Sequence, residues 1–420
     1  MKAPLALLVG VQCPSEGPEL WRISDTLDEL AELARTAGLS VYQKIYQTRS
    51  APHRKTYVGK GKIEEIAALI ESKNIEIVVT DDELSPVQTK SLESLLKVKI
   101  LDRTRLILDI FSQHAHTAEA KLQVELAQLD YLRPRLTRLW THLSRLGGGI
   151  GTRGPGEKQL ESDKRQIDHR ITFIKRKLEK VSHNRSLRRK NRKELPVPTG
   201  TLIGYTNAGK STILNLLTNA EVLAENKLFA TLDPTSRRFQ LPNQDLSVLT
   251  DTVGFIQNLP HHLVKAFFST LEEVTLSDYL IHVIDASHPN LEGMLNTTMS
   301  LIPKLKAEQL PMLYVFNKKD QVTKPNAVKA IMQDYTPHIF ISAQNKTASV
   351  SLKKGIMALL ERAQKEHSFR IPYNRMDIMD LLHKHGKTIH INYTDTQIQV
   401  KTKMNPITAA KILSQLNPKK

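Results

Sequence analysis

The sequence predicts an α/β protein of several domains, in which a long antiparallel helical hairpin separates two α/β domains. Its 420 residues exceed one ordinary core, because domains typically have about 100 to 200 residues. Short apolar runs alternate with amphipathic stretches near the start of the chain and again in its second half. Between these parts, apolar residues recur at steps of three, four or seven, which is typical of helices with one apolar seam.

Residues 1–117 are predicted to form the first α/β domain, with a largely parallel sheet. Leu5 to Val9 and Ile75 to Thr80 are two of its predicted strands, and Trp21 to Ala37 is one of the amphipathic stretches between strands. The run from Gly59 to Lys62 permits two interpretations. We favour a turn into the following helix over a contact with RNA or a second nucleotide.

Residues 118–195 are predicted to form the helical hairpin. Six glycines and one proline fall between Gly147 and Gly156, so one helix cannot continue through this block, and we expect a long tip there. Pro134 is expected to kink the first arm. The apolar positions of the two arms are Leu122, Leu126, Leu129, Leu136 and Leu143, then Leu160, Ile167, Ile171, Ile174, Leu178 and Val181.

Positive charge is concentrated in the same region. The whole chain has a formal net charge of +17, and residues 133–193 carry 19 Lys or Arg against 5 Asp or Glu, a net charge of +14. A run of one sign suits a polyphosphate partner, because each neutralised phosphate releases condensed counterions. The alternative is a solvated charged helix. We favour nucleic acid.

The composition excludes several classes of protein. Cys13 is the only cysteine, which excludes an intramolecular disulfide and a multi-cysteine metal site, and we expect it to be a buried, inert thiol. The apolar run near Met1 is too short for a signal sequence, and no segment approaches the roughly 20 apolar residues that span a bilayer. We therefore expect a cytoplasmic, monomeric protein without a membrane span.

Residues 196–365 follow a linker marked by prolines and contain a phosphate-binding loop pattern from Gly204 to Ser211, between a predicted strand and a predicted helix. In such a loop the backbone amides face the phosphates, Lys210 reaches the β and γ oxygens, and the Ser211 hydroxyl ligates magnesium. The predicted contacts of the loop are Gly204, Tyr205, Thr206, Asn207, Ala208, Gly209, Lys210, Ser211 and Thr212.

Three further motifs follow in the order of a Ras-like P-loop GTPase domain. Asp251 ends an apolar strand, so it can hold magnesium through water, and the Gly254 amide can meet the γ-phosphate. Asp320 follows another strand, where its carboxylate can accept two hydrogen bonds from guanine but not from adenine. The motifs predict GTP or GDP with Mg²⁺. Their contact residues are Asp251, Thr252, Val253 and Gly254, then Asn317, Lys318 and Asp320, then Ser342 and Ala343, which would close over the base.

Leu228 to Thr235 is predicted to form the first switch, between the first two motifs. One threonine of this segment should ligate magnesium and sense the γ-phosphate, and we choose Thr231 over Thr235. Phe229 and Ala230 are further predicted nucleotide contacts.

Lys210, Thr231 and Gly254 form the predicted catalytic set. The residue after Gly254 is Phe255, whereas many GTPases carry at that place a glutamine that orients the attacking water. Phenylalanine cannot do so. Intrinsic hydrolysis should therefore be slow.

Residues 366–420 are predicted to form a small C-terminal α/β domain. A helix is expected from Met376 to His385, strands from Lys387 to Tyr393 and from Gln397 to Lys403, and a last helix from Asn405 to Leu416.

Several stretches together resemble the HflX family, which is grouped with the TrmE, Era and Obg GTPases. The resemblance covers nearly the whole chain, and the glycine-rich block is its most specific part. The stretches are Gly59 to Lys62, Leu101 to Thr104, Leu122 to Leu129, Gly148 to Glu157 and Gly204 to Ser211.

The resemblance implies binding to the large ribosomal subunit and splitting of stalled ribosomes under stress. It also implies that the hairpin tip contacts ribosomal RNA and that Asn207 holds K⁺ near the β and γ phosphates, where the cation replaces an arginine finger. A loop-stabilising role of the Asn207 side chain is the alternative. The residues that we assign to RNA are Gly149, Gly151, Arg153, Gly154 and Lys158.

Two other functions remain open at this stage. One is an RNA-binding protein, or an ATP-dependent RNA remodeller, in which GTP acts only as a switch. The other is a tRNA-modifying GTPase, which we consider weak because that group relies on a cysteine near the C-terminus and the only cysteine here is Cys13.

Overall fold

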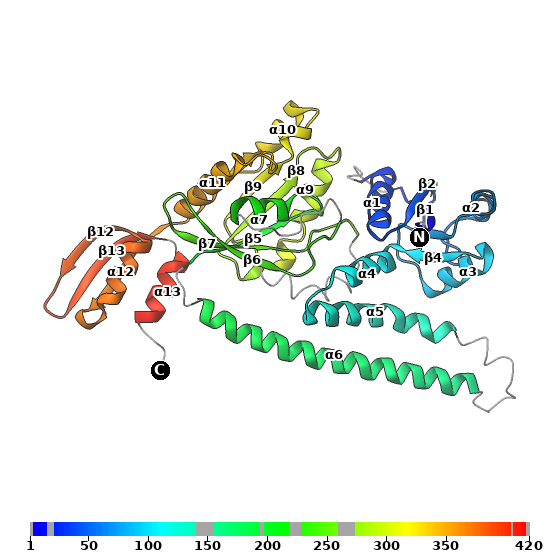
Figure 1. Cartoon of the computed structure of the whole chain (residues 1–420), viewed down its shortest axis with the longest axis horizontal. Coiled ribbons are helices and arrows are strands. Elements are labelled where there is room, and N and C mark those ends of the chain that lie inside the picture. Colours follow the sequence, from blue (N-terminus) through cyan, green and yellow to red (C-terminus); the bar gives the residue numbers. More distant parts are fainter. Residues whose placement is uncertain are drawn as a thin grey trace. The chain divides into compact units, whose positions relative to one another are not determined.

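The computed structural model describes residues 3–14, 21–139, 155–193, 197–218, 228–258, 274–404 and 406–416. By their contacts the residues divide into two compact units. The first comprises Met1–Val181, Asn226–Asp233 and Ile256–Ser269, and the second comprises Ser182–Glu225, Pro234–Phe255 and Thr270–Lys420. The predicted multidomain α/β fold is confirmed (Figure 1), whereas the four domain ranges remain a proposal.

The first unit contains a four-stranded parallel sheet with the order β2-β1-β3-β4. Parallel neighbours require crossover connections, and helices provide them here. The Gly59 backbone caps the second helix, which agrees with the turn predicted there. The elements are β1 (Leu5–Gln12), α1 (Ile23–Thr36), β2 (Ser40–Thr48), α2 (Lys60–Lys73), β3 (Ile77–Thr80), α3 (Pro86–Leu96), β4 (Lys99–Asp102) and α4 (Arg103–His114).

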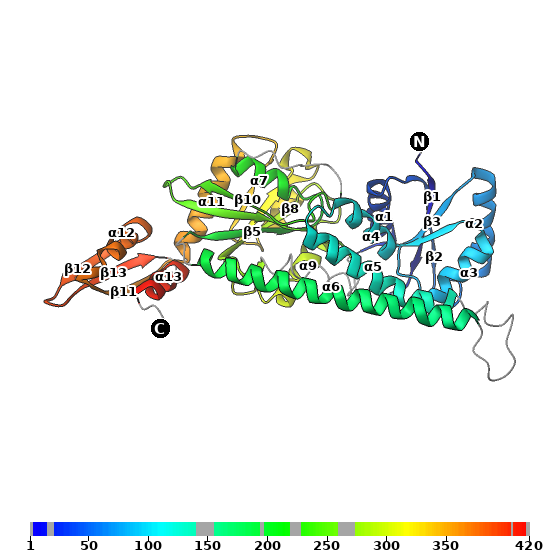
Figure 2. The ribbon, with the colours of Figure 1, turned by 60° about the horizontal axis from the view of Figure 1, so that its bottom comes forward.

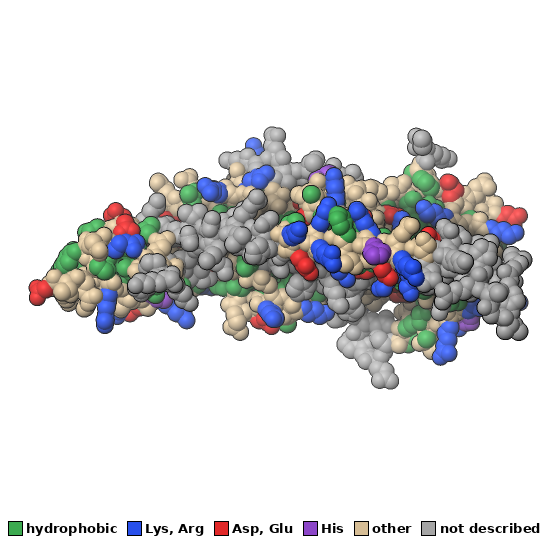
Figure 3. Space-filling view, turned by 90° about the horizontal axis from the view of Figure 1, so that it is seen from below, with side chains coloured by type: hydrophobic (Ala, Val, Ile, Leu, Met, Phe, Trp, Pro, Cys, Tyr) green, Lys and Arg blue, Asp and Glu red, His purple; other side chains and the backbone are tan. Residues whose placement is uncertain are grey.

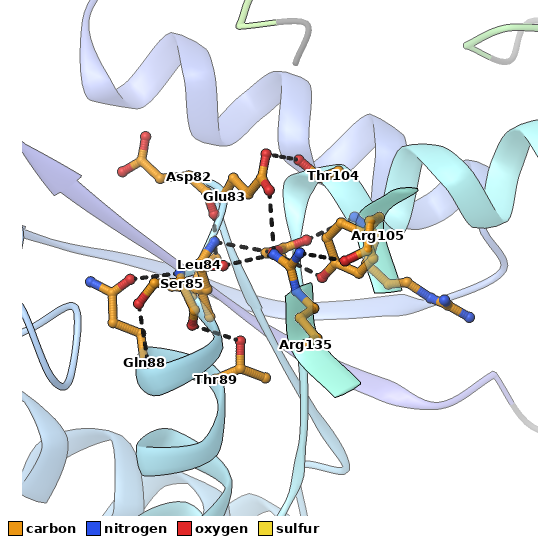
Figure 4. A network of polar contacts seen from close by, with 12 residues as sticks. Asp82, Glu83, Leu84, Ser85, Gln88, Thr89, Thr104, Arg105 and Arg135 are labelled. Atoms are coloured by element: carbon orange, nitrogen blue, oxygen red, sulfur yellow. Dashed lines mark hydrogen bonds and ion pairs between the residues drawn. The ribbon is translucent and has the colours of Figure 1, made fainter. Parts of the chain in front are cut away.

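A polar network at the carboxyl end of β4 joins the first arm of the hairpin to this sheet (Figure 4). The Asp102 carboxylate caps α4 by accepting from the Arg105 amide at 2.8 Å, and it also accepts from the Leu84 amide at 3.1 Å. From α5 (Ala118–Leu139), the Tyr131 hydroxyl and Arg135 Nη2 donate to the same carboxylate at 3.0 and 3.2 Å. Burial, the largest cause, raises the pKa of Asp102.

The hairpin arms α5 and α6 (Pro155–Lys193) run side by side (Figures 1 and 2). Two ion pairs join them, Arg170 Nε to Glu125 Oε1 at 2.6 Å and Arg133 Nε to Asp168 Oδ1 at 2.8 Å. Pro134 lies inside α5. In the predicted seam, Ile171 and Ile174 are buried, while Leu122, Leu126, Leu129, Ile167, Leu178 and Val181 are half-buried.

Cys13 is exposed, so the expectation of a buried thiol is wrong. The residue directly follows β1, whose last buried position is Val11. No helix in the described part of the chain is long and apolar enough to cross a membrane.

The second unit contains a six-stranded sheet with the order β10-β9-β8-β5-β7-β6, in which only the edge strand β6 is antiparallel to its neighbour. One face packs against α7 and α11, and the other against α9 and α10. The elements are β5 (Thr199–Gly204), α7 (Lys210–Thr218), β6 (Thr235–Gln240), β7 (Leu246–Asp251), β8 (Tyr279–Asp285), α9 (Leu291–Met299), β9 (Met312–Asn317), α10 (Pro325–Met332), β10 (His338–Phe340) and α11 (Ala348–Arg362).

The C-terminal segment forms a three-stranded antiparallel sheet with the order β11-β13-β12 and a core of its own. Both predicted helices and two predicted strands are present. Sequence reasoning missed the first strand, β11. The elements are β11 (Lys365–Pro372), α12 (Met376–His385), β12 (Lys387–Tyr393), β13 (Gln397–Met404) and α13 (Pro406–Leu416).

Candidate nucleotide site

The predicted nucleotide motifs follow three neighbouring or nearly neighbouring parallel strands. Gly204 ends β5, Asp251 ends β7 and Asn317 ends β9. The carboxyl ends of parallel strands lie at one edge of a sheet, where α/β folds place their ligands. The fold therefore brings these motifs together.

Glycine is required at two positions of the phosphate-binding loop. Gly204 has a φ of 143°, and a Cβ there would lie 2.1 Å from the backbone oxygen of Val283. Gly209 has a φ of 98°, and a Cβ there would lie 2.3 Å from Asn317 Nδ2. Any side chain at either position would force the loop out of this conformation.

Lys210 is the first residue of α7, and its ammonium group lies inside the loop. Its Nζ donates to the backbone oxygens of Tyr205 at 2.8 Å and Gly204 at 3.2 Å. Burial lowers the pKa of Lys210 to about 8, and the nearby Asp251 carboxylate opposes this shift. A buried cation encircled by loop oxygens is suited to a polyphosphate.

Ser211 and Asp251 supply the oxygen donors predicted for magnesium. Ser211 Oγ donates to Asp251 Oδ2 at 2.6 Å, so a hydroxyl and a buried carboxylate lie side by side. Hard oxygen ligands of this kind suit Mg²⁺. Thr252, the next residue, turns away and donates through Oγ1 to the backbone oxygen of Leu202 at 2.7 Å.

The segment after Asp251 lies directly against the phosphate-binding loop. The Phe255 amide donates to the Gly204 oxygen at 3.1 Å, and the Thr206 amide donates to the Phe255 oxygen at 2.8 Å. A Cβ at Gly254 would lie 2.7 Å from Thr206 Cα and 2.8 Å from Lys210 Nζ. Only glycine permits this approach.

The side chain of Phe255 is buried in an apolar cluster and is only 2% exposed. Its neighbours in that cluster include Ile203 from β5 and Leu280 from β8. The position at which many GTPases carry a water-orienting glutamine is therefore a core position in this structure.

Asn317 connects the base motifs to the phosphate-binding loop. Its Nδ2 donates to the Ala208 oxygen at 2.9 Å, and its Oδ1 accepts from the Ala343 amide at 2.9 Å. The exposed Asp320 carboxylate is hydrogen-bonded by Ser342, which is the largest cause of its lowered pKa. A carboxylate that stays ionised can accept two hydrogen bonds from guanine.

Lys318 has the left-handed backbone that starts the turn after β9. Its Nζ pairs with Asp285 Oδ2 at 2.7 Å, so its stem extends across the ends of two neighbouring strands. This is the position at which a lysine stem can cover one face of a bound base.

Residues 228–233 of the predicted first switch belong to the first compact unit, whereas Pro234 and Thr235 belong to the second. Phe229 is buried, and its ring meets the ring of Phe111 of α4 edge-on with centroids 4.7 Å apart. Thr231 and Thr235 are both half-buried. The nucleotide contacts assigned to Phe229, Ala230 and Thr231 remain predictions.

The RNA contacts assigned to the hairpin tip are not placed. Gly149, Gly151, Arg153 and Gly154 lie outside the described residues, and Lys158 lies on α6 with its side chain undescribed. These assignments also remain predictions.

Sequence reasoning missed the residues that join the first switch, and the segment after Gly254 that we call the second switch, to α4 and to the start of the hairpin. The Asp233 carboxylate accepts from the amides of His116 and Thr117 at 3.0 and 3.1 Å and from the Thr117 hydroxyl, immediately before α5. The buried guanidinium of Arg103 donates to the backbone oxygen of Gln257 at 3.2 Å. These pairs are far apart in the sequence, so no local signal could reveal them.

Three family models match the chain in succession. The model of the GTP-binding GTPase N-terminal region matches residues 24–112, and that of the GTP-binding GTPase middle region matches residues 114–192. The model described as 50S ribosome-binding GTPase matches residues 199–318.

Similar proteins cover most of the chain. The GTPase HflX of Caldanaerobacter subterraneus subsp. tengcongensis is 44% identical over 399 residues, which are 95% of this chain and 90% of that protein. The GTPase HflX of Escherichia coli strain K12 is 44% identical over 359 residues, 83% of this chain and 82% of that protein. A solved GTP-binding protein from Sulfolobus solfataricus, in complex with GDP, is 24% identical with a TM-score of 0.46, over 85% of this chain and 98% of that chain.

Proposed function

Because the chain belongs to the HflX family of GTPases and therefore hydrolyses GTP, we propose that it binds the large ribosomal subunit and uses GTP to split or rescue stalled ribosomes under stress. GTP binding would order the switch segments, and the switch segments would set the conformation of the hairpin. The hairpin would engage ribosomal RNA.

The contact between the first switch and the base of the hairpin is the observation that carries this proposal. Asp233 receives three hydrogen bonds at the N-terminus of α5, where a carboxylate also interacts favourably with the helix dipole. Phe229 packs on Phe111 of α4, the helix that precedes α5. A change in the switch that moves Thr231 must therefore disturb the start of the hairpin.

The charge of α6 supports RNA as the partner of the hairpin. Figure 3 shows Lys and Arg side chains gathered along the described part of this helix. Such a face attracts the phosphate backbone and makes binding depend on salt. The exposed cations of this part are Lys164, Arg165, Arg170, Lys175, Arg176, Lys177 and Lys180, against the exposed acid Glu179.

The buried position of Phe255 supports a GTPase whose hydrolysis depends on its partner. Its buried ring cannot orient water, so the ribosome would supply the missing electrostatics or order the switches. Ser211, Thr231 and Asp251 would hold Mg²⁺ together with the phosphates, and Asn207 would hold K⁺ beside them. Bound cations would neutralise charge that develops on the phosphates during hydrolysis.

The test measures GTP hydrolysis by the purified chain with and without large ribosomal subunits, in potassium and in sodium. We expect the subunits to accelerate hydrolysis and potassium to exceed sodium. A rate that large subunits leave unchanged would remove the main support for the proposal. Unwinding of RNA by Lys210→Ala, with ATP and without GTP, would favour an ATP-dependent RNA remodeller instead.

Removal of the hairpin tip separates its role from that of the nucleotide site. Deletion of Gly148 to Gly156 should abolish the acceleration by large subunits and leave GTP affinity unchanged, because these residues lie outside every nucleotide motif. Nucleotide binding by fluorescent GTP titration is the control. Loss of nucleotide binding would instead assign the hairpin a structural role.

A further inference from the structure

The sheet of the C-terminal segment has one covered face and one open face. The covered face packs through Phe369, Ile398 and Val400 against Ile378 of α12 and Ile412 of α13. Both helices lie on this side of the sheet. Side chains alternate between the two faces of a strand, so the intervening residues of β11 and β13 point to the opposite face.

The register places nine exposed side chains on that open face, three from each strand. Lys403 pairs with Glu366 of β11 and Lys387 of β12, Lys401 pairs with Ser368 and His390, and Gln399 pairs with Arg370 and Asn392. We call these nine residues the open face. Its members are Glu366, Ser368, Arg370, Lys387, His390, Asn392, Gln399, Lys401 and Lys403.

The nine residues of the open face are all charged or polar, and the face is basic, with the exposed Pro372 and Ile389 beside it. It has four Lys or Arg and one acid, Glu366, so its net charge is +3 with histidine neutral. Lys401 Nζ pairs with Glu366 Oε2 at 2.8 Å, and that ion pair is the largest cause of the lowered pKa of Glu366, with Lys403 contributing. The other three cations of the open face, Arg370, Lys387 and Lys403, lie around this pair and account for the net charge of +3.

We propose that the open face binds the phosphate backbone of RNA. The proposal rests on the proposed function, and it assigns to the C-terminal sheet a second RNA contact, separate from the hairpin. Lys401 and Lys403 form a row along the central strand, and Arg370 and Lys387 flank it. Gln399, Asn392 and Ser368 add neutral donors for phosphate and ribose oxygens.

The chemistry of the face favours RNA over a protein partner. Stable protein interfaces have an apolar, often aromatic centre with few charged residues. The nine residues of the open face have the reverse composition: cations and amides along three paired strands. Such an array matches a chain of repeating anions, and it binds through counterion release.

The test compares the salt dependence of RNA binding by the full chain and by Arg370→Gln/Lys387→Gln/Lys403→Gln. The probe is a labelled single-stranded RNA oligonucleotide of mixed sequence, titrated at several KCl concentrations. Each lost phosphate contact lowers the slope of log K against log salt by about 0.7 for a single strand, so the slope should fall by about 2. An unchanged slope in the triple variant would overturn the inference.

A matched control removes the same charge elsewhere in the second unit. Lys304→Gln/Lys329→Gln/Lys346→Gln alters three exposed lysines outside the C-terminal sheet and should leave the slope unchanged. An equal fall in the control would overturn the inference, because net charge alone would then explain the effect. Equal losses in binding to RNA and to polyglutamate would likewise overturn RNA as the partner.

Two measurements distinguish loss of the RNA contact from a folding defect and from failure of the proposed function. If the triple variant melts earlier than the parent, Lys403→Gln alone is measured, and a slope lowered by about 0.7 is expected. Acceleration of GTP hydrolysis by large subunits is recorded for the unaltered chain. If that acceleration is present while the triple variant keeps the full slope, the C-terminal contact fails and the proposed function stands.

Discussion

Phe255→Gln should destabilise the folded protein and leave GTP hydrolysis slow, although it introduces the residue that many GTPases use to orient water. The backbone of residue 255 is paired on both sides with the phosphate-binding loop, at 2.8 and 3.1 Å. This pairing directs the side chain into the apolar cluster with Ile203 and Leu280. A glutamine there would lie in the core and not beside the γ-phosphate.

The cost of this substitution can be estimated from burial. Phe255 is 2% exposed, so its replacement loses most of the burial energy of an aromatic ring, about 2 to 3 kcal/mol. An amide left without hydrogen bonds in the same place costs a further 1 to 3 kcal/mol or so. The sum is roughly 3 to 6 kcal/mol, which corresponds to a melting temperature lower by about 10 to 20 °C for a unit of this size.

The assay pairs a thermal melt with a single-turnover measurement of GTP hydrolysis, without ribosomes. Phe255→Leu is the control, because it retains an apolar side chain and should cost less than half as much. We expect Phe255→Gln to melt earlier and to hydrolyse GTP no faster than the parent. A faster rate at an unchanged melting temperature would refute the reasoning, since residue 255 would then leave the core when GTP binds.

Three other substitutions or conditions test the site. Asp320→Asn should shift base preference from guanine toward xanthine, measured by competition between the two nucleotides; unchanged GTP affinity would count against the guanine contact. GTP affinity should fall as pH rises through about 8, because the pKa of Lys210 in the free protein is lowered to about 8 and the phosphates need its charged form. Between pH of about 8 and 10.5, the ordinary pKa of lysine, the unfolded chain binds more protons than the folded protein without nucleotide. The folded protein therefore becomes more stable as pH rises through this range. Asp233→Asn should weaken the cap of α5 by about 1 kcal/mol, seen as faster amide exchange at Thr117, and should reduce the response to large subunits.

The phosphate-binding loop could be predicted from the sequence because its chemistry is local. Gly204, Gly209 and Lys210 act through backbone conformation and through a spacing of a few residues, which the sequence states directly. Asp251 and Asn317 could be predicted because each is the last residue of a largely buried strand in a mostly parallel sheet. The link from Asn317 to Ala208 could not, since it depends on how two distant loops meet.

The strand β11 was missed because its apolar signal is short. Only Phe369 and Ile371 alternate with polar residues, and apart from Pro372 at its end the remainder of the strand is charged or polar. Pairing with the central strand β13 determines its conformation, and that pairing is not local. Cys13 was expected to be buried because free cysteines are usually buried in folded proteins. Its position just beyond β1 determines its exposure instead.

In the proposed mechanism, the distance between Thr231 and Asp233 along the chain determines how the nucleotide affects the hairpin. Two residues span at most about 7 Å when extended, so a displacement of Thr231 is passed on to Asp233 and to its three bonds at the start of α5. Arg103 adds a second attachment, because it holds the Gln257 backbone just beyond Phe255. Both switch segments are therefore joined to the α4–α5 region, and ordering of either one by GTP must strain or release that attachment. A partner that binds the hairpin would act on the same attachments, so RNA binding and GTP binding should each change the affinity for the other by the same factor.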